Sequence, residues 1–349
     1  MKISLLTTGG TIASVASEKG LQPGLAGEQL LQACPELMGF EHEVSIVDLM
    51  SKDSSNMHPS DWIAMADCIR QNAPLSDALV MLHGTDTMAW TASALSYLLN
   101  DLPVPIVLTG SMLSADAPGS DVSENIYSAF QFALQLAMYK RRGVSVAFAG
   151  SLIHGPKVTK IDSHRKKAFI SVDYPLLGEM KDRETHKVAW LTPQTPKLSG
   201  ERPWGTSPKF ESKIALVPIF PGIETRFLDS VADMGPRAVV LEGYGLGGVP
   251  FMGEDLLPAI RRGISRGIPF VLRGQAAFGG TDPAVYEVGQ RALDLGVLSA
   301  RDMTREALMT KLMLLLPVCA PSDLERHLSV NMCDDVDRKS TRLNSSHGS

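Results

Sequence analysis

The stretch LLTTGGTIAS, residues 5–14, joins an apolar run to two threonines, two glycines and a third threonine. The run KISLLT (2–7) has the length and composition of a strand buried in a sheet. Gly9 and Gly10 allow a sharp turn and let another part of the chain approach the backbone closely. Thr11 then follows the carboxyl end of the strand, the edge at which open α/β sheets bind ligands. Taken alone, the two glycines are also compatible with plain turn chemistry.

Beyond this stretch, short apolar runs alternate with segments of helical periodicity, which predicts an α/β fold with a doubly wound, mainly parallel sheet. Further strands are expected at 43–47, 78–82, 104–109 and 144–149, and helices at 59–73, 87–99 and 121–139. The same alternation returns later, with strands at 213–219, 237–242 and 268–273 and helices at 254–266 and 305–316. A second, smaller α/β domain is therefore predicted.

Composition changes mark the domain boundaries. We expect an N-terminal domain carrying the functional residues over 1–190, a linker over 191–212, a smaller domain over 213–333 and a disordered or non-native tail over 334–349. The linker is rich in proline, serine, threonine, glycine and charge. The end of the tail is polar and aperiodic, without apolar anchors.

Composition also limits the class of protein. The 349 residues carry a formal net charge of -5 without a basic stripe, which argues against nucleic-acid binding and favours a small-molecule partner. No apolar stretch approaches the ~18 residues of a membrane span, and no secretory signal is visible. The four cysteines lack CxxC spacing, so we expect free thiols and a cytoplasmic location.

Two short motifs imitate known sites without the required context. GYGLGG (243–248) matches a dinucleotide-binding fingerprint, but VPFMGED intervenes before the next helix, so a glycine loop at a tight turn or subunit contact is the favoured interpretation. GISRG (263–267) matches a nucleophile elbow with strand and helix in reversed order, so Ser265 is expected at a helix end. No histidine spacing indicates a metal, and we predict neither metal nor cofactor.

Hydroxyl and carboxylate groups follow two other strands. HGTDTM (83–88) puts Thr85 and Asp86 at the start of a helix, where both could simply be capping residues. One capping residue would suffice, and this strand should end at the same edge as the Thr11 strand. Ser54 and Ser55 lie on that edge as well, in a loop whose composition is ordinary for a turn.

Lys160 follows the fifth strand, in a segment with several other basic residues, so spacing alone does not select it. A threonine hydroxyl is a weak nucleophile that needs an adjacent base, and a lysine serves when its environment favours the neutral amine. Thr11, Thr85, Asp86 and Lys160 together would suit acyl transfer or hydrolysis through a covalent ester without a metal.

These motifs resemble the L-asparaginase family, and more its bacterial cytoplasmic (type I) branch than the secreted one. The resemblance rests on TTGGTIAS, HGTDTM, the Ser-Ser-Asn-Met loop and VTKIDSHRKKAF leading to SVDYPLLG, and it extends over residues 2–333. It implies hydrolysis of L-asparagine to L-aspartate and ammonia by a homodimer or homotetramer. The resemblance does not indicate whether the enzyme prefers L-asparagine or L-glutamine as its substrate.

Position by position, the resemblance implies that Thr11 is the nucleophile and that Thr85, Asp86 and Lys160 form a proton relay. It further implies that Asp86 binds the substrate α-amino group, that Ser54, with Ser55 beside it, binds the α-carboxylate, and that the Thr85 amide belongs to the oxyanion hole. Leu21 stands where many members carry a loop tyrosine, so the role of that tyrosine is not carried over.

Two other functions stay open from the sequence. An amidase subunit of a tRNA-dependent amidotransferase belongs to the same broad family, although such a subunit would call for an extra N-terminal docking domain. A non-catalytic amino-acid sensor could use the same pocket, but binding alone has no use for a proton relay.

Overall fold

The computed structural model describes residues 1–17, 20–23, 26–32, 34–37, 41–182, 187–190, 196–200 and 202–336. The chain divides into two compact units with the boundary between Glu201 and Arg202, and each unit has its own main sheet. Within the described ranges, no helix has the length and apolar character needed to cross a membrane.

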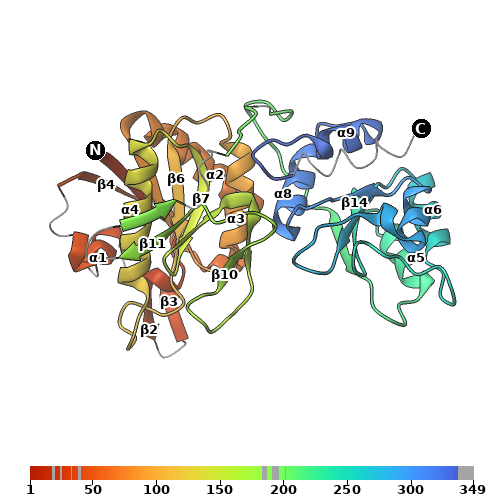
Figure 1. Cartoon of the computed structure of the whole chain (residues 1–349), viewed down its shortest axis with the longest axis horizontal. Helices are drawn as coiled ribbons and strands as arrows, with labels where there is room; N and C mark the ends of the chain where they lie inside the picture. Colours follow the sequence, from red (N-terminus) through yellow and green to blue (C-terminus); the bar gives the residue numbers. More distant parts are fainter. Residues whose placement is uncertain are drawn as a thin grey trace. The chain divides into compact units, whose positions relative to one another are not determined.

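The first unit contains a mixed sheet, which lies behind α4 in Figure 1. Its strand order is β12-β11-β8-β7-β6-β5-β1-β4. The five strands from β7 to β4 in this order run parallel, and β8, β11 and β12 continue the sheet antiparallel. The strands are β1 (Lys2–Thr7), β4 (Glu43–Asp48), β5 (Ala78–Leu82), β6 (Pro105–Thr109), β7 (Gly143–Phe148), β8 (Ser151–His154), β11 (Gly178–Asp182) and β12 (Lys187–Trp190). The predicted doubly wound, mainly parallel sheet is confirmed.

Helices complete this unit, and β5 and β6 are buried along their whole length. The helices are α1 (Gly27–Gln32), α2 (Pro59–Asn72), α3 (Met88–Leu98) and α4 (Val122–Met138). Along α4, Ile126 and Phe130 are fully buried and belong to one apolar cluster with Leu5, Val80 and Val107 of the sheet. Burial on this scale explains why β5 and β6 read as continuous apolar runs rather than alternating ones.

Two small hairpins lie outside the main sheet: β2 (Ser14–Ser17) pairs with β3 (Gly20–Pro23), and β9 (Val158–Lys160) pairs with β10 (Phe169–Ser171). In the second hairpin, Lys160 faces Phe169 in the register. The hairpin therefore fixes the backbone of Lys160 through pairing.

The second unit is a smaller α/β fold with a parallel sheet in the order β13-β14-β15-β16. Its elements are β13 (Ile214–Pro218), α5 (Thr225–Asp233), β14 (Ala238–Gly243), α6 (Leu257–Ser265), β15 (Phe270–Gly274), α7 (Glu287–Leu293), β16 (Leu298–Ser299), α8 (Arg305–Leu315) and α9 (Leu324–Ser329). The glycine loop after β14 does not run straight into a helix, and Ser265 ends α6, in agreement with both sequence interpretations.

A buried ion pair joins α8 to the end of the second unit. Lys311 Nζ donates to Asp335 Oδ2 over 2.6 Å, and neither side chain is exposed to solvent. Burial alone would raise the pKa of Asp335, but Lys311 and the amides of Met332 and Cys333 outweigh it and hold this pKa below its usual value. Described, packed structure thus continues past residue 334, where the sequence places the start of the tail, and residues 337–349 lie outside the described part.

Replacing Lys311 by methionine should destabilise the protein strongly. Removing one partner of a buried pair leaves the other charge uncompensated, which costs about 3–5 kcal/mol of unfolding free energy. Chemical denaturation of Lys311→Met would measure the loss, with Lys213→Met at an exposed site of the same unit as the control. A Lys311→Met protein as stable as the control would contradict the inferred role of the pair.

Candidate active site

The two glycines after β1 bring the first loop against the loop that follows β5. Gly9 and Gly10 have φ of 92° and 85°, a region that favours glycine. A Cβ on Gly10 would lie 2.3 Å from Gly84 Cα, and a Cβ on Gly9 would lie 2.4 Å from the Lys52 nitrogen. The close backbone approach predicted from the sequence is confirmed. Thr11, partly buried, is the next residue after this contact.

Lys160 connects the two residues that follow Gly84. Its Nζ donates to Thr85 Oγ1 over 2.9 Å and to Asp86 Oδ1 over 2.7 Å. Thr85 is buried and 15% of the Lys160 side chain is exposed, whereas 64% of the Asp86 side chain is exposed. The structure therefore brings together three of the predicted site residues, from chain positions 74 and 75 residues apart.

Helix capping does not account for Thr85 and Asp86. Helix α3 begins at Met88, so its N-cap residue is Thr87, and the Thr87 side chain makes no capping hydrogen bond. Thr87 Oγ1 donates instead to the carbonyl oxygen of Ser54 over 2.7 Å. Thr87 thus ties the loop after β4 to the loop after β5, and the capping alternative is wrong for these residues.

Ser54 and Ser55 point to different partners. Ser54 is buried, and a Cβ on Gly84 would lie 2.6 Å from its Oγ, so this hydroxyl lies against the Gly84 backbone. Ser55 is exposed, and its Oγ donates to Asp53 Oδ1 over 2.6 Å. Hydrogen bonds from Ser55 lower the pKa of Asp53. Ser54 therefore lies against the residue that precedes Thr85, while Ser55 closes its own loop. The Leu21 side chain lies outside the described part.

His83 is the residue that the sequence interpretation passed over. It is fully buried directly before Gly84, with Nδ1 2.7 Å from the Gly84 carbonyl oxygen and Nε2 2.9 Å from Thr91 Oγ1. Burial lowers the pKa of His83 to about 4. Its position between an apolar run and the Gly84-Thr85 pair was the available signal, but a lone histidine next to a strand is usually structural.

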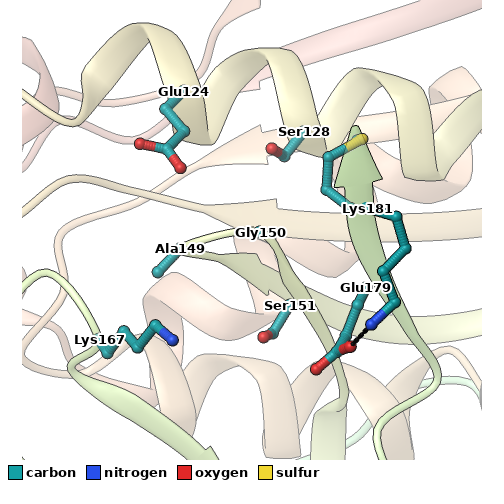
Figure 2. A pocket seen from close by; sticks show the side chains of 9 residues that line it. Glu124, Ser128, Ala149, Gly150, Ser151, Lys167, Glu179 and Lys181 are labelled. Atoms are coloured by element: carbon teal, nitrogen blue, oxygen red, sulfur yellow. Dashed lines mark hydrogen bonds and ion pairs between the residues drawn. The ribbon is translucent and has the colours of Figure 1, made fainter. Parts of the chain in front are cut away.

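A separate cavity of about 310 Å³ opens beside the turn between β7 and β8 (Figure 2). Glu124 and Ser128 of α4 line one side, and Lys181 forms an ion pair with Glu179 on β11. None of the predicted site residues lines this cavity. Among the described residues, no cluster of three or more histidine, cysteine or carboxylate side chains could hold a metal ion.

Family models match both units of the chain. Residues 2–194 match the asparaginase N-terminal domain, and residues 213–321 match the glutaminase/asparaginase C-terminal domain. An L-asparaginase from Thermococcus kodakarensis is 37% identical over 317 residues, covering 90% of this chain and 92% of that protein. A glutamyl-tRNA(Gln) amidotransferase subunit from Pyrococcus horikoshii is 33% identical over 90% of this chain and 72% of its own length.

Solved structures show the same likeness. The thermostable L-asparaginase from Thermococcus kodakarensis superposes with a TM-score of 0.86 at 33% identity, covering 97% of this chain and 99% of that one. L-asparaginase I from Vibrio cholerae gives a TM-score of 0.80 at 29% identity, covering 96% and 99%. On the family models, the sequence relatives and the fold together, this chain belongs to the L-asparaginase family of enzymes.

Proposed function

We propose that the protein hydrolyses L-asparagine to L-aspartate and ammonia through an ester on Thr11. The observation that carries this proposal is the position of Lys160 Nζ, which is hydrogen-bonded to both Thr85 and Asp86 next to the Gly10–Gly84 contact. A mostly buried amine within 2.9 Å of a threonine hydroxyl can exchange a proton with it. An amino-acid binding site without turnover would not need this arrangement.

The reaction divides into two acyl transfers. Thr11 Oγ attacks the side-chain amide carbon of asparagine, and its proton passes to Thr85 while Thr85 gives its own proton to the neutral Lys160 amine. The tetrahedral intermediate then collapses, the C–N bond breaks, and ammonia leaves with the returned proton. Water, deprotonated along the same route, attacks the ester and releases aspartate and the free Thr11 hydroxyl.

The other site residues bind the substrate. The Asp86 carboxylate is exposed enough to accept the substrate α-amino group while it holds Lys160. In this proposal Ser54 donates to the α-carboxylate, with Ser55 beside it. The Thr85 amide stabilises the oxyanion of the tetrahedral intermediate, an interaction that typically contributes about 10²- to 10³-fold in rate. A homodimer or homotetramer without metal or cofactor completes the proposal.

Ammonia release by the purified protein tests this function. With L-asparagine as the only substrate, and with neither tRNA nor a second protein, we expect steady release of equal amounts of ammonia and aspartate. L-glutamine in a parallel assay gives the substrate preference, which one methylene changes by about 1–3 kcal/mol. Substrate binding without ammonia release would instead support an amino-acid sensor.

The amidotransferase relatives favour one second candidate. They are named as glutamyl-tRNA(Gln) amidotransferase subunits, and this chain spans 72% of the length of the Pyrococcus horikoshii protein. In that role, the same relay would release ammonia for transfer to a tRNA-bound acceptor. Ammonia release that requires tRNA or a partner protein would favour this function over the first.

A further inference from the structure

The oxyanion-binding amide assigned to Thr85 belongs to the same peptide group as the Gly84 carbonyl, which His83 contacts. In a trans peptide, the C=O and the N–H point in opposite directions. The described part of the chain contains no cis peptide bond. The Thr85 N–H donates no hydrogen bond to any acceptor of the described residues. Whatever fixes the Gly84 carbonyl on one side therefore aims the Thr85 N–H on the other.

We propose that His83 is a positioning residue that aims the Thr85 amide at the oxyanion by donating a hydrogen bond to the Gly84 carbonyl. This inference rests on the proposed hydrolysis at the same site. A carbonyl oxygen only accepts hydrogen bonds, so the 2.7 Å contact requires the proton on Nδ1 of His83. The Gly84 carbonyl therefore selects the tautomer of His83 that carries its proton on Nδ1.

Two further hydrogen bonds, on the Nε2 side of the ring, stabilise that tautomer. With Nδ1 protonated and the ring neutral, Nε2 must accept, so the Thr91 hydroxyl donates to it over 2.9 Å. Thr91 in turn accepts the indole N–H of Trp62 over 3.1 Å. Trp62 and Thr91 are buried, and burial keeps His83 neutral by lowering its pKa to about 4. Each hydrogen bond in this series therefore has a defined donor and acceptor, running from Trp62 through Thr91 and His83 to the Gly84 carbonyl.

The surrounding backbone leaves the peptide little freedom to take another orientation. The His83 N–H donates to the Thr109 carbonyl over 2.8 Å, which continues the pairing of β5 with β6. Gly84 is pressed between Ser54 and Gly10. A fixed donor gives the most in the transition state, because it needs no reorganisation as the negative charge develops.

Two substitutions test the Nδ1 hydrogen bond to Gly84 separately from the Nε2 hydrogen bond to Thr91. In His83→Asn, the side-chain amide can place an N–H near the Nδ1 position and keep the bond to Gly84. In His83→Gln, the amide reaches the Nε2 position and serves Thr91, but the donor to Gly84 is lost. We expect kcat for L-asparagine to fall about 10- to 100-fold in His83→Gln with KM changed by less than about threefold, since a misaimed amide retains part of its effect. His83→Asn should recover most of kcat.

Leu136→Ala is the control for simple destabilisation. Leu136 is buried at the far end of α4, and its truncation lowers stability without removing a side-chain hydrogen bond. It should lower the melting temperature while leaving kcat per folded protein unchanged. If the activity lost in His83→Gln is fully explained by a smaller folded fraction, as expected for Leu136→Ala, the positioning role of His83 is overturned.

Nitrogen NMR of ¹⁵N-histidine-labelled wild-type protein tests the hydrogen bonds without any substitution. We expect a His83 signal with the proton on Nδ1 and a bare Nε2. A proton on Nε2 overturns the inference. If the wild type releases no ammonia from L-asparagine, the proposed function fails and takes the catalytic role of His83 with it. The NMR result still shows by itself whether the hydrogen-bond chain exists.

Discussion

Substituting Thr11 with alanine should abolish turnover of L-asparagine while the protein still folds and binds its substrate. In the proposed reaction this hydroxyl supplies the bond-forming atom of the first acyl transfer, and removing a catalytic nucleophile costs roughly 10⁴-fold or more in kcat. Binding should persist because Ser54 and Asp86, which are proposed to hold the substrate, come from other loops. Stopped assays for ammonia and calorimetric titration with L-asparagine would measure the two effects separately.

Thr11→Ser is the matched control for this substitution, because it keeps the hydroxyl and removes only a methyl group. It should retain measurable turnover and form an ester detectable by mass spectrometry after rapid acid quenching. Near-normal activity in Thr11→Ala would falsify the assignment of the nucleophile. Loss of both binding and folding in Thr11→Ala would instead mean that the loop after Gly10 depends on this side chain for its structure.

The fold was predictable where burial dictates the sequence pattern. Each predicted parallel strand overlaps an observed one. The pattern is clearest in β5 and β6, which are buried throughout and leave uninterrupted apolar runs. The antiparallel strands β8, β11 and β12 escaped prediction, since they are short and include polar residues such as Ser151 and Glu179. Such strands are specified by their neighbours in the sheet and carry a weak local signal.

The candidate site was predictable in its residue types but not in its contacts. Strand order placed Thr11 and Thr85 at one edge, since β1 and β5 are adjacent and parallel. The choice of Lys160 among several lysines came from the family resemblance, and only the three-dimensional contact with Thr85 gives it a physical basis. The role proposed for His83 depends on a carbonyl of the next residue and a hydroxyl of α3, which no linear pattern displays.

Replacing Lys160 by methionine should lower kcat by about 10²- to 10⁴-fold, the usual contribution of a general base. Methionine preserves much of the length and apolar stem of lysine but can neither accept nor return the Thr85 proton. The KM for L-asparagine should change less than kcat, because Lys160 bonds to Thr85 and Asp86 and is not assigned to the substrate. Steady-state kinetics over a range of asparagine concentrations separates the two parameters.

Lys166→Met provides the comparison, since Lys166 is an exposed lysine on the connection between the same two hairpin strands. It removes one positive charge from the same hairpin, as Lys160→Met does, without removing the proposed proton acceptor. If both variants lose activity equally, the effect is one of overall charge and Lys160 is not the base. If Lys160→Met alone is slow, and its crystal structure keeps Thr85 and Asp86 in place, the missing function is proton transfer, because geometry and charge are then both accounted for.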